Sequence, residues 1–157
     1  MYTRILVPVD GSPTSSAGLA EAVKVARQTG GQIRLLHVVE QMPFLMGAEA
    51  YGSIAGDVAV LLRTAGEQIL QDARTQVMNA GIAVDTALFE GLGSRVSDRV
   101  VEEIAAWGAD LVVVGTHGRR GVGRMMLGSD AEQILRTAKI PVLLVRSAEQ
   151  AANPPAG

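Results

Sequence analysis

Five short apolar runs, separated by amphipathic stretches, constrain the fold of this chain more than any other feature. The first, fourth and fifth runs are apolar at consecutive positions, which is typical of strands buried on both faces of a parallel sheet. The five predicted strands are residues 5–9, 33–39, 83–89, 111–114 and 141–145.

Helical periodicity fills the intervals between these runs. Ser12 is predicted to cap the first helix, with Pro13 at its first position and Gly30 just past its end. A long helix should run from about 57 to 80 with a stripe of apolar residues facing the sheet (Leu62, Ala65, Ile69, Ala73 and Val77). Further helices should cover 96–107 and begin at 129, the last with Ile134, Leu135 and Ala138 on its apolar side.

Alternating strands and helices with short links predict an α/β fold. We expect an open five-stranded parallel sheet with helices on both faces and right-handed crossovers. Ligands of such folds bind at the carboxyl ends of the strands, where neighbouring crossovers leave on opposite faces. Residues 40–56 do not fit the pattern and are predicted to be a long connection, of the kind that often serves as a functional lid.

Length and charge narrow the class of protein. The 157 residues predict one domain, placed at 1–146, and a disordered tail over 147–157. The balance of 14 basic against 16 acidic residues, with 3% aromatics, argues against a nucleic-acid partner. No apolar run is long enough to span a membrane and no signal peptide is evident, so we expect a cytoplasmic protein without a membrane partner. With no cysteine and two histidines, we expect no dedicated metal site.

Glycine is concentrated between the fourth predicted strand and the last predicted helix. Five glycines lie within the 14 residues from 115 to 128, together with Arg119, Arg120 and Arg124. Glycines allow close backbone approach, and amides at a helix start with nearby guanidinium groups suit a phosphate. The segment is not a P-loop, because Ser129 stands where a P-loop has its lysine. A dinucleotide-binding fingerprint is also absent after the first strand.

The spacing of Gly115, Gly118, Gly128 and Ser129 resembles that of universal stress proteins of the nucleotide-binding kind. The likeness extends over residues 3–146 and includes Val-Pro-Val-Asp at 7–10, Leu-His-Val at 36–38 and Pro-Val-Leu-Leu-Val at 141–145. It implies a Rossmann-like fold similar to that of adenine nucleotide α-hydrolases. It also implies binding of ATP or another adenine nucleotide, Mg²⁺ arriving with the phosphates, a regulatory or stress-response role, and a homodimer paired through Val142–Val145.

The resemblance also implies roles for individual residues. Asp10 would contact the ribose, beside Pro8 and Val9, and the Val38 backbone would meet adenine. The phosphates would be held by Gly115, Gly118, Gly128 and Ser129. Independently of the resemblance, Arg119 is a candidate phosphate contact because of its charge, and Asp130 is one through its backbone amide. Asp130 departs from the family, which usually has a small apolar residue there. Because a carboxylate repels an anion at a helix N-terminus, we expect weaker triphosphate binding or a preference for fewer phosphates.

Simpler interpretations of the same residues remain open. Asp10 could be only a turn former, Ser129 and Glu132 could form a capping box, and the arginines could be a solvated turn. We expect His37 to be a satisfied core or rim histidine and His117 to be a loop residue. No general base with a suitable partner is evident, which argues against an enzyme. The alternatives to a nucleotide-binding module are a slow ATPase and a dimeric interaction protein that no longer binds nucleotide.

Overall fold

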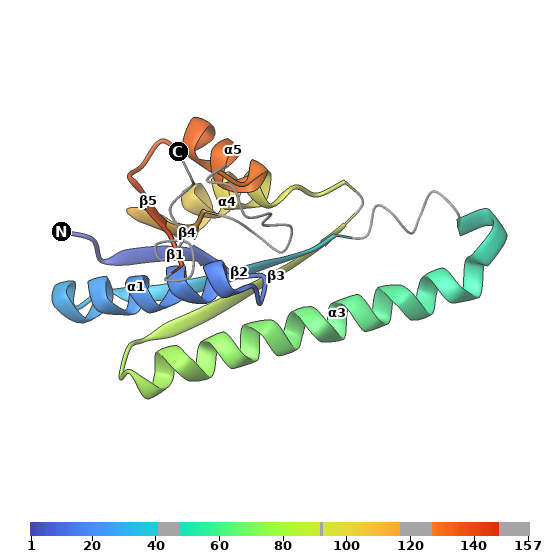
Figure 1. Ribbon diagram of the computed structural model, residues 1–157, viewed down its shortest axis with the longest axis horizontal. Coiled ribbons are helices and arrows are strands. Elements are labelled where there is room, and N and C mark those ends of the chain that lie inside the picture. Colours follow the sequence, from blue (N-terminus) through green and yellow to red (C-terminus); the bar gives the residue numbers. More distant parts are fainter. Residues whose placement is uncertain (41–47, 92, 117–126, 148–157) are drawn as a thin grey trace, which may run out of the picture.

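The computed structural model describes residues 1–40, 48–91, 93–116 and 127–147, with the backbone alone for 48–55 (Figure 1). The predicted tail therefore lies almost wholly outside the described residues. The elements in chain order are β1 (Arg4–Pro8), α1 (Pro13–Thr29), β2 (Gln32–Glu40), α3 (Ala48–Asn79), β3 (Val84–Gly91), α4 (Val96–Trp107), β4 (Leu111–Gly115), α5 (Ser129–Thr137) and β5 (Val142–Val145).

All five strands join one parallel sheet in the order β3-β2-β1-β4-β5, which confirms the predicted fold class. The chain starts at the centre of the sheet, adds β2 and β3 on one side, and then returns to add β4 and β5 on the other. Helices α1 and α3 cover one face, while α4 and α5 cover the other (Figure 1). The point at which the crossovers change direction therefore lies between β1 and β4.

The consecutive apolar residues of the central strands are explained by this two-sided burial. In β1, Ile5 and Val7 pack toward α1 and α3, whereas Leu6 packs toward α4 and α5. All three side chains are fully buried. The predicted ends of α1 are confirmed, because Ser12 Oγ accepts a hydrogen bond from the Ser15 amide at 3.2 Å and Gly30 takes a left-handed φ of 69°.

Helix α3 differs from its prediction at its start. It begins at Ala48 instead of about 57, so most of the connection predicted over 40–56 is helix or strand. The difference has a physical cause, because Gly52, Ser53 and Gly56 have low helix propensity and their sequence therefore predicts a loop. Its 32 residues span about 48 Å, against about 30 Å for β2. The N-terminal part of α3 therefore extends past the sheet (Figure 1).

The apolar stripe of α3 is largely as predicted, with one exception. Ala73 and Val77 are buried and Leu62 and Ile69 are half-buried, but Ala65 is exposed. Gly66 takes its place against the sheet, where a Cβ would lie 2.7 Å from Cδ2 of His37. Absence of a side chain at Gly66 thus allows the histidine ring to pack directly on the helix.

A charged cluster lies between the sheet and α4. The Arg34 guanidinium, on β2, donates to Glu103 of α4 and to Asp85 of β3. It also lies over the Trp107 ring, 4.8 Å from its centroid. Glu103 is a buried residue, only 7% exposed, so its charge depends on Arg34 for compensation.

Asp110, just before β4, holds the start of β1. Its carboxylate accepts hydrogen bonds from the amides of Thr3 and Arg4, both at 2.9 Å, and from Oγ1 of Thr3. Partial burial alone would raise the pKa of Asp110, but these hydrogen bonds outweigh it and hold the pKa below its ordinary value. The contact therefore stabilises the folded state when the carboxyl is ionised.

We expect Asp110→Asn to lower the free energy of unfolding by about 1–2 kcal/mol at pH 7. Because the folded pKa is depressed, the contribution of Asp110 is fully present above its unfolded pKa of about 4 and is lost as the pH falls through the folded pKa. Denaturant titrations should show that the difference in unfolding free energy between wild type and Asp110→Asn is smaller at pH 2.5 than at pH 7. An equal difference at both pH values, or the same loss of stability for the exposed Asp57→Asn, would contradict this account.

Within the described part of the chain, no helix combines the length and the apolar character needed to cross a membrane.

Candidate functional site

The described site residues converge on the carboxyl edge of the sheet, at the point between β1 and β4 where the crossovers change direction. β1 and β4 are direct neighbours, with Ile5 paired to Leu111. Asp10 follows β1, Gly115 ends β4, and Ser129 begins α5 after β4. Gly118 and Arg119, with His117, Arg120 and Arg124, lie outside the described residues.

The end of β1 is firmly tied to β2. The Val9 amide donates to Leu36 O at 2.8 Å, and Val9 O is 2.7 Å from Nδ1 of His37. His37 is 7% exposed, which confirms it as a satisfied core histidine. Pro8 is half-buried, while Val9 and Val38 are buried. The backbone polar groups of Val9 are thus already engaged with β2, and its part in ligand contact stays a prediction.

Asp10 forms a turn through its own side chain. Its Oδ1 accepts a hydrogen bond from the Ser12 amide at 2.8 Å, and its amide donates to Ser15 Oγ at 3.1 Å. The turn-forming interpretation is therefore confirmed. A carboxylate has about four lone-pair sites, so a ribose hydroxyl could share it with the Ser12 amide. The ribose role is compatible with this geometry and stays a prediction.

Gly115 has a packing role that sequence reasoning missed. A Cβ at this position would lie 2.4 Å from Thr14 O and 2.6 Å from Thr14 C. A Cβ at Gly18 would in turn lie 3.2 Å from the Gly115 amide nitrogen. The end of β4 therefore packs backbone to backbone on the first turn of α1. The spacing of the glycines had suggested only phosphate contact, since a single sequence does not show which helix approaches.

Thr116 and Gly128, at the two ends of the segment between β4 and α5, are hydrogen-bonded to each other. The Thr116 amide donates to Val145 O at 3.0 Å, and the Gly128 amide donates to Thr116 O at 2.6 Å. Thr116 is buried. Residues 116 and 128 are therefore fixed to each other and to the end of β5.

The capping box left open as an alternative at the start of α5 is not formed. Gly128, not Ser129, is the N-cap, and no side chain makes a capping hydrogen bond there. The Glu132 carboxylate instead accepts from Arg136 at 2.7 Å, one turn along the helix. Leu135, expected on the apolar side, is 47% exposed. The uncapped first turn, with exposed Ser129 and Asp130, leaves amide groups that suit an anion.

Negative charge gathers at this edge. Partial desolvation raises the pKa of Asp130, repulsion by Glu40 and Asp10 raises it further, and Arg95 opposes the rise. Sequence reasoning missed Glu40 and Arg95 because they carry no motif. Their positions were the available signal, since Glu40 ends β2 and Arg95 directly precedes α4, both at the same edge of the sheet.

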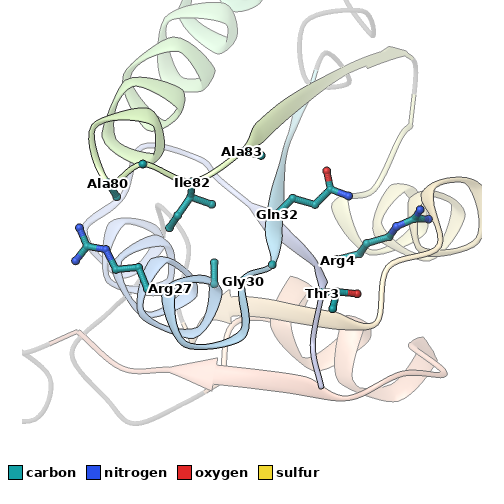
Figure 2. A pocket seen from close by; sticks show the side chains of 11 residues that line it. Thr3, Arg4, Arg27, Gly30, Gln32, Ala80, Ile82 and Ala83 are labelled. Atoms are coloured by element: carbon teal, nitrogen blue, oxygen red, sulfur yellow. The ribbon is translucent and has the colours of Figure 1, made fainter.

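Among the described residues, no group of three or more acidic or histidine side chains is arranged to hold a metal ion. A surface pocket of about 580 Å³ lies at the opposite edge, by the amino ends of β1 and β2 (Figure 2). Figure 2 shows the side chains of Arg4 and Arg27 on different sides of this pocket, pointing apart. Because its charged groups do not converge, we do not assign the pocket a role.

Three solved structures that share this fold hold an adenine mononucleotide. They are an Arabidopsis thaliana protein with AMP, an Archaeoglobus fulgidus protein with dAMP and a universal stress protein with cAMP. Their TM-scores run from 0.65 to 0.69 at 18% to 23% identity, and each match covers more than 90% of both chains. At such identities the likeness establishes the fold alone.

The family is established by closer matches. The model of the universal stress protein family matches residues 1–146. A universal stress protein of Methanocaldococcus jannaschii is 32% identical over 93% of this chain and 83% of its own length. A universal stress protein A homolog of Coxiella burnetii is 33% identical over 92% of this chain and 95% of its own length. The structure of UspA from Lactobacillus plantarum, at 22% identity, adds to the evidence for the fold alone, with a TM-score of 0.77 over 92% of this chain and 98% of its own. The chain belongs to the universal stress protein family.

Proposed function

We propose that this protein binds an adenine nucleotide between the carboxyl ends of β1 and β4 and acts as a regulatory or stress-response module. One observation carries the proposal: Asp10, the end of β4 and the uncapped start of α5 meet at the edge where folds of this kind take their ligands. Three proteins of the same fold that hold AMP, dAMP and cAMP support it.

The hydrogen-bonding groups at this edge suit the parts of an adenine nucleotide. Asp10 would accept a hydrogen bond from a ribose hydroxyl, and the Val38 backbone would contact adenine. The first-turn amides of α5 and the Ser129 hydroxyl would hold a phosphate, with Gly118 and Arg119 completing the site. If ATP is bound with Mg²⁺, the phosphates would supply most of its ligands, since the described residues offer no cluster of three.

The outer edge of the sheet supports the proposed homodimer. β5 pairs with β4 alone in the described sheet, and all four of its apolar residues are half-buried. A second copy pairing along Val142–Val145 would cover these side chains. We place this dimer in the cytoplasm, where its output would pass through its surface or a partner protein.

Two experiments test the nucleotide proposal. Protein purified without added ligand, then denatured, should release an adenine nucleotide detectable by chromatography. In a thermal-shift panel, an adenine nucleotide at 100 times its Kd should add about 2.7 kcal/mol of stability. That corresponds to a rise in Tm of roughly 5–10 °C for a chain of this length. GMP is the matched control. Absence of released nucleotide together with no shift by ATP, ADP, AMP or cyclic AMP would refute the proposal.

A further inference from the structure

We propose that Asp130 makes this site select adenine nucleotides by the charge of their phosphate chain, favouring one phosphate over three. The inference rests on the proposed function, because it takes the carboxyl edge to be the nucleotide site. It assigns selection by phosphate number to one side chain, because the fold alone does not provide it.

The position of Asp130 places its charge where a phosphate would bind. It is the second residue of α5, within the uncapped first turn that follows Gly128. The helix dipole and the first-turn amides there attract an anion, whereas a carboxylate in the same turn repels one. The site therefore combines directional donors with an opposing charge. A ligand that accepts these hydrogen bonds with little negative charge is favoured over one that adds charge without accepting further hydrogen bonds.

Two further carboxylates strengthen this effect. Glu40 ends β2 and Asp10 follows β1, and the strands β2, β1 and β4 are consecutive in the sheet. Glu40 and Asp10 thus come from two neighbouring strand ends. Asp130 stands two residues after Gly128, whose amide donates to Thr116 O beside the end of β4. Desolvation raises the pKa of Asp130, and repulsion by Glu40 and Asp10 raises it further. Arg95, at the start of α4, is the described cation that acts on Asp130. Of the described charges that act on Asp130, two carboxylates thus outnumber one arginine.

The expected discrimination follows from Coulomb's law. A further negative charge about 7 Å from Asp130, at an effective dielectric constant between those of protein and water, should weaken binding roughly three- to tenfold. Going from AMP to ATP adds about two charges at neutral pH, because the terminal phosphate is mostly doubly ionised above its second pKa of about 6. We therefore expect AMP to bind at least about tenfold more tightly than ATP in the absence of divalent metal.

Isothermal titration calorimetry on the full chain in EDTA tests the inference, with AMP, ADP and ATP as ligands. Wild type should bind AMP more tightly than ATP. Asp130→Asn should lower the ratio of the Kd for ATP to the Kd for AMP about tenfold, chiefly because ATP binds more tightly to the variant. Glu132→Gln is the matched control. It removes a carboxylate from the same first turn, but one already paired with Arg136, and should leave the ratio unchanged.

Cyclic AMP supplies a second readout, since its single phosphate charge does not titrate near neutral pH. Its affinity for wild type should rise as the pH falls through the raised pKa of Asp130, because the repelling charge is neutralised. Asp10, Glu40 and Arg95, which face the same region, are identical in the two proteins. The Asp130→Asn profile should therefore be flatter than that of wild type.

The outcomes separate the two proposals. If both proteins bind nucleotides with the same AMP to ATP ratio, Asp130 has no selective role and the proposed function still stands. If neither protein binds any adenine nucleotide, the proposed function fails and the inference with it. Should Asp130→Asn unfold at a lower temperature than wild type, Asp130→Ser provides a second neutral variant for the same comparison.

Discussion

Gly115→Ala is expected to lower the free energy of unfolding by about 3 kcal/mol or more. The added Cβ would lie 2.4 Å from Thr14 O, well inside van der Waals contact, and its neighbour is backbone that cannot rotate away. Gly115 is not among the glycines with positive φ, so the requirement is steric and not conformational. Relief would demand that β4 and the first turn of α1 move apart, which would also disturb the packing of Gly18. Urea denaturation monitored by circular dichroism gives the measurement.

The matched control is Gly56→Ala in α3. A Cβ there has no heavy atom within 4 Å, and alanine is the better helix former. The free energy of unfolding of this variant should rise by about 0.5–1 kcal/mol, so the same substitution should have opposite effects on stability at the two positions. An unchanged unfolding midpoint for Gly115→Ala would show that α1 and β4 do not approach as closely as the structure has them.

Arg34→Met is expected to cost about 3–5 kcal/mol, because it leaves the buried Glu103 carboxylate without its counter-charge. Asp85, the other partner, is more than half exposed and can turn to water, so Glu103 dominates the loss. The stacking of the guanidinium on Trp107 is lost as well. Thermal or urea unfolding should show the effect at neutral pH.

Two companion variants identify the cause. Adding Glu103→Leu to Arg34→Met removes the orphaned charge and should restore most of the stability, since a buried ion pair is often replaced by apolar groups at little cost. Arg63→Met makes the identical substitution in an exposed ion pair with Glu67 and Glu90, and should cost less than about 1 kcal/mol. A double variant no more stable than Arg34→Met would show that lost packing, not unpaired charge, is responsible.

The architecture of the sheet was predictable because its central strands must be buried on both faces. Ile5, Leu6 and Val7 could satisfy that demand only in a covered parallel sheet, and Ser12 with Gly30 marked the ends of α1 by local chemistry alone. The start of α3 was missed because its glycines disfavour helix. Local reasoning also left open a capping box at Ser129, whereas Gly128 is the N-cap.

Within the site, sequence patterns identified candidate residues but not how those residues pack or which charges act on them. The spacing at Gly115 and Ser129 pointed to a phosphate, yet the close approach of Thr14 to Gly115 depends on how α1 crosses β4. The action of Glu40 and Arg95 on Asp130 likewise arises from strand order, which brings residues far apart in sequence to one edge. Charge relations of this kind need the three-dimensional arrangement.

The hydrogen bond from the Gly128 amide to Thr116 O has a consequence for how this protein can change over time. It joins the two ends of the glycine-rich segment independently of what stands between them. The entropy of closing a loop grows only slowly with its length, by about 0.6 kcal/mol for each doubling. Insertions, deletions and recombined sequences between these anchors should therefore leave the sheet intact, so ligand preference can diverge in this protein at little cost to folding.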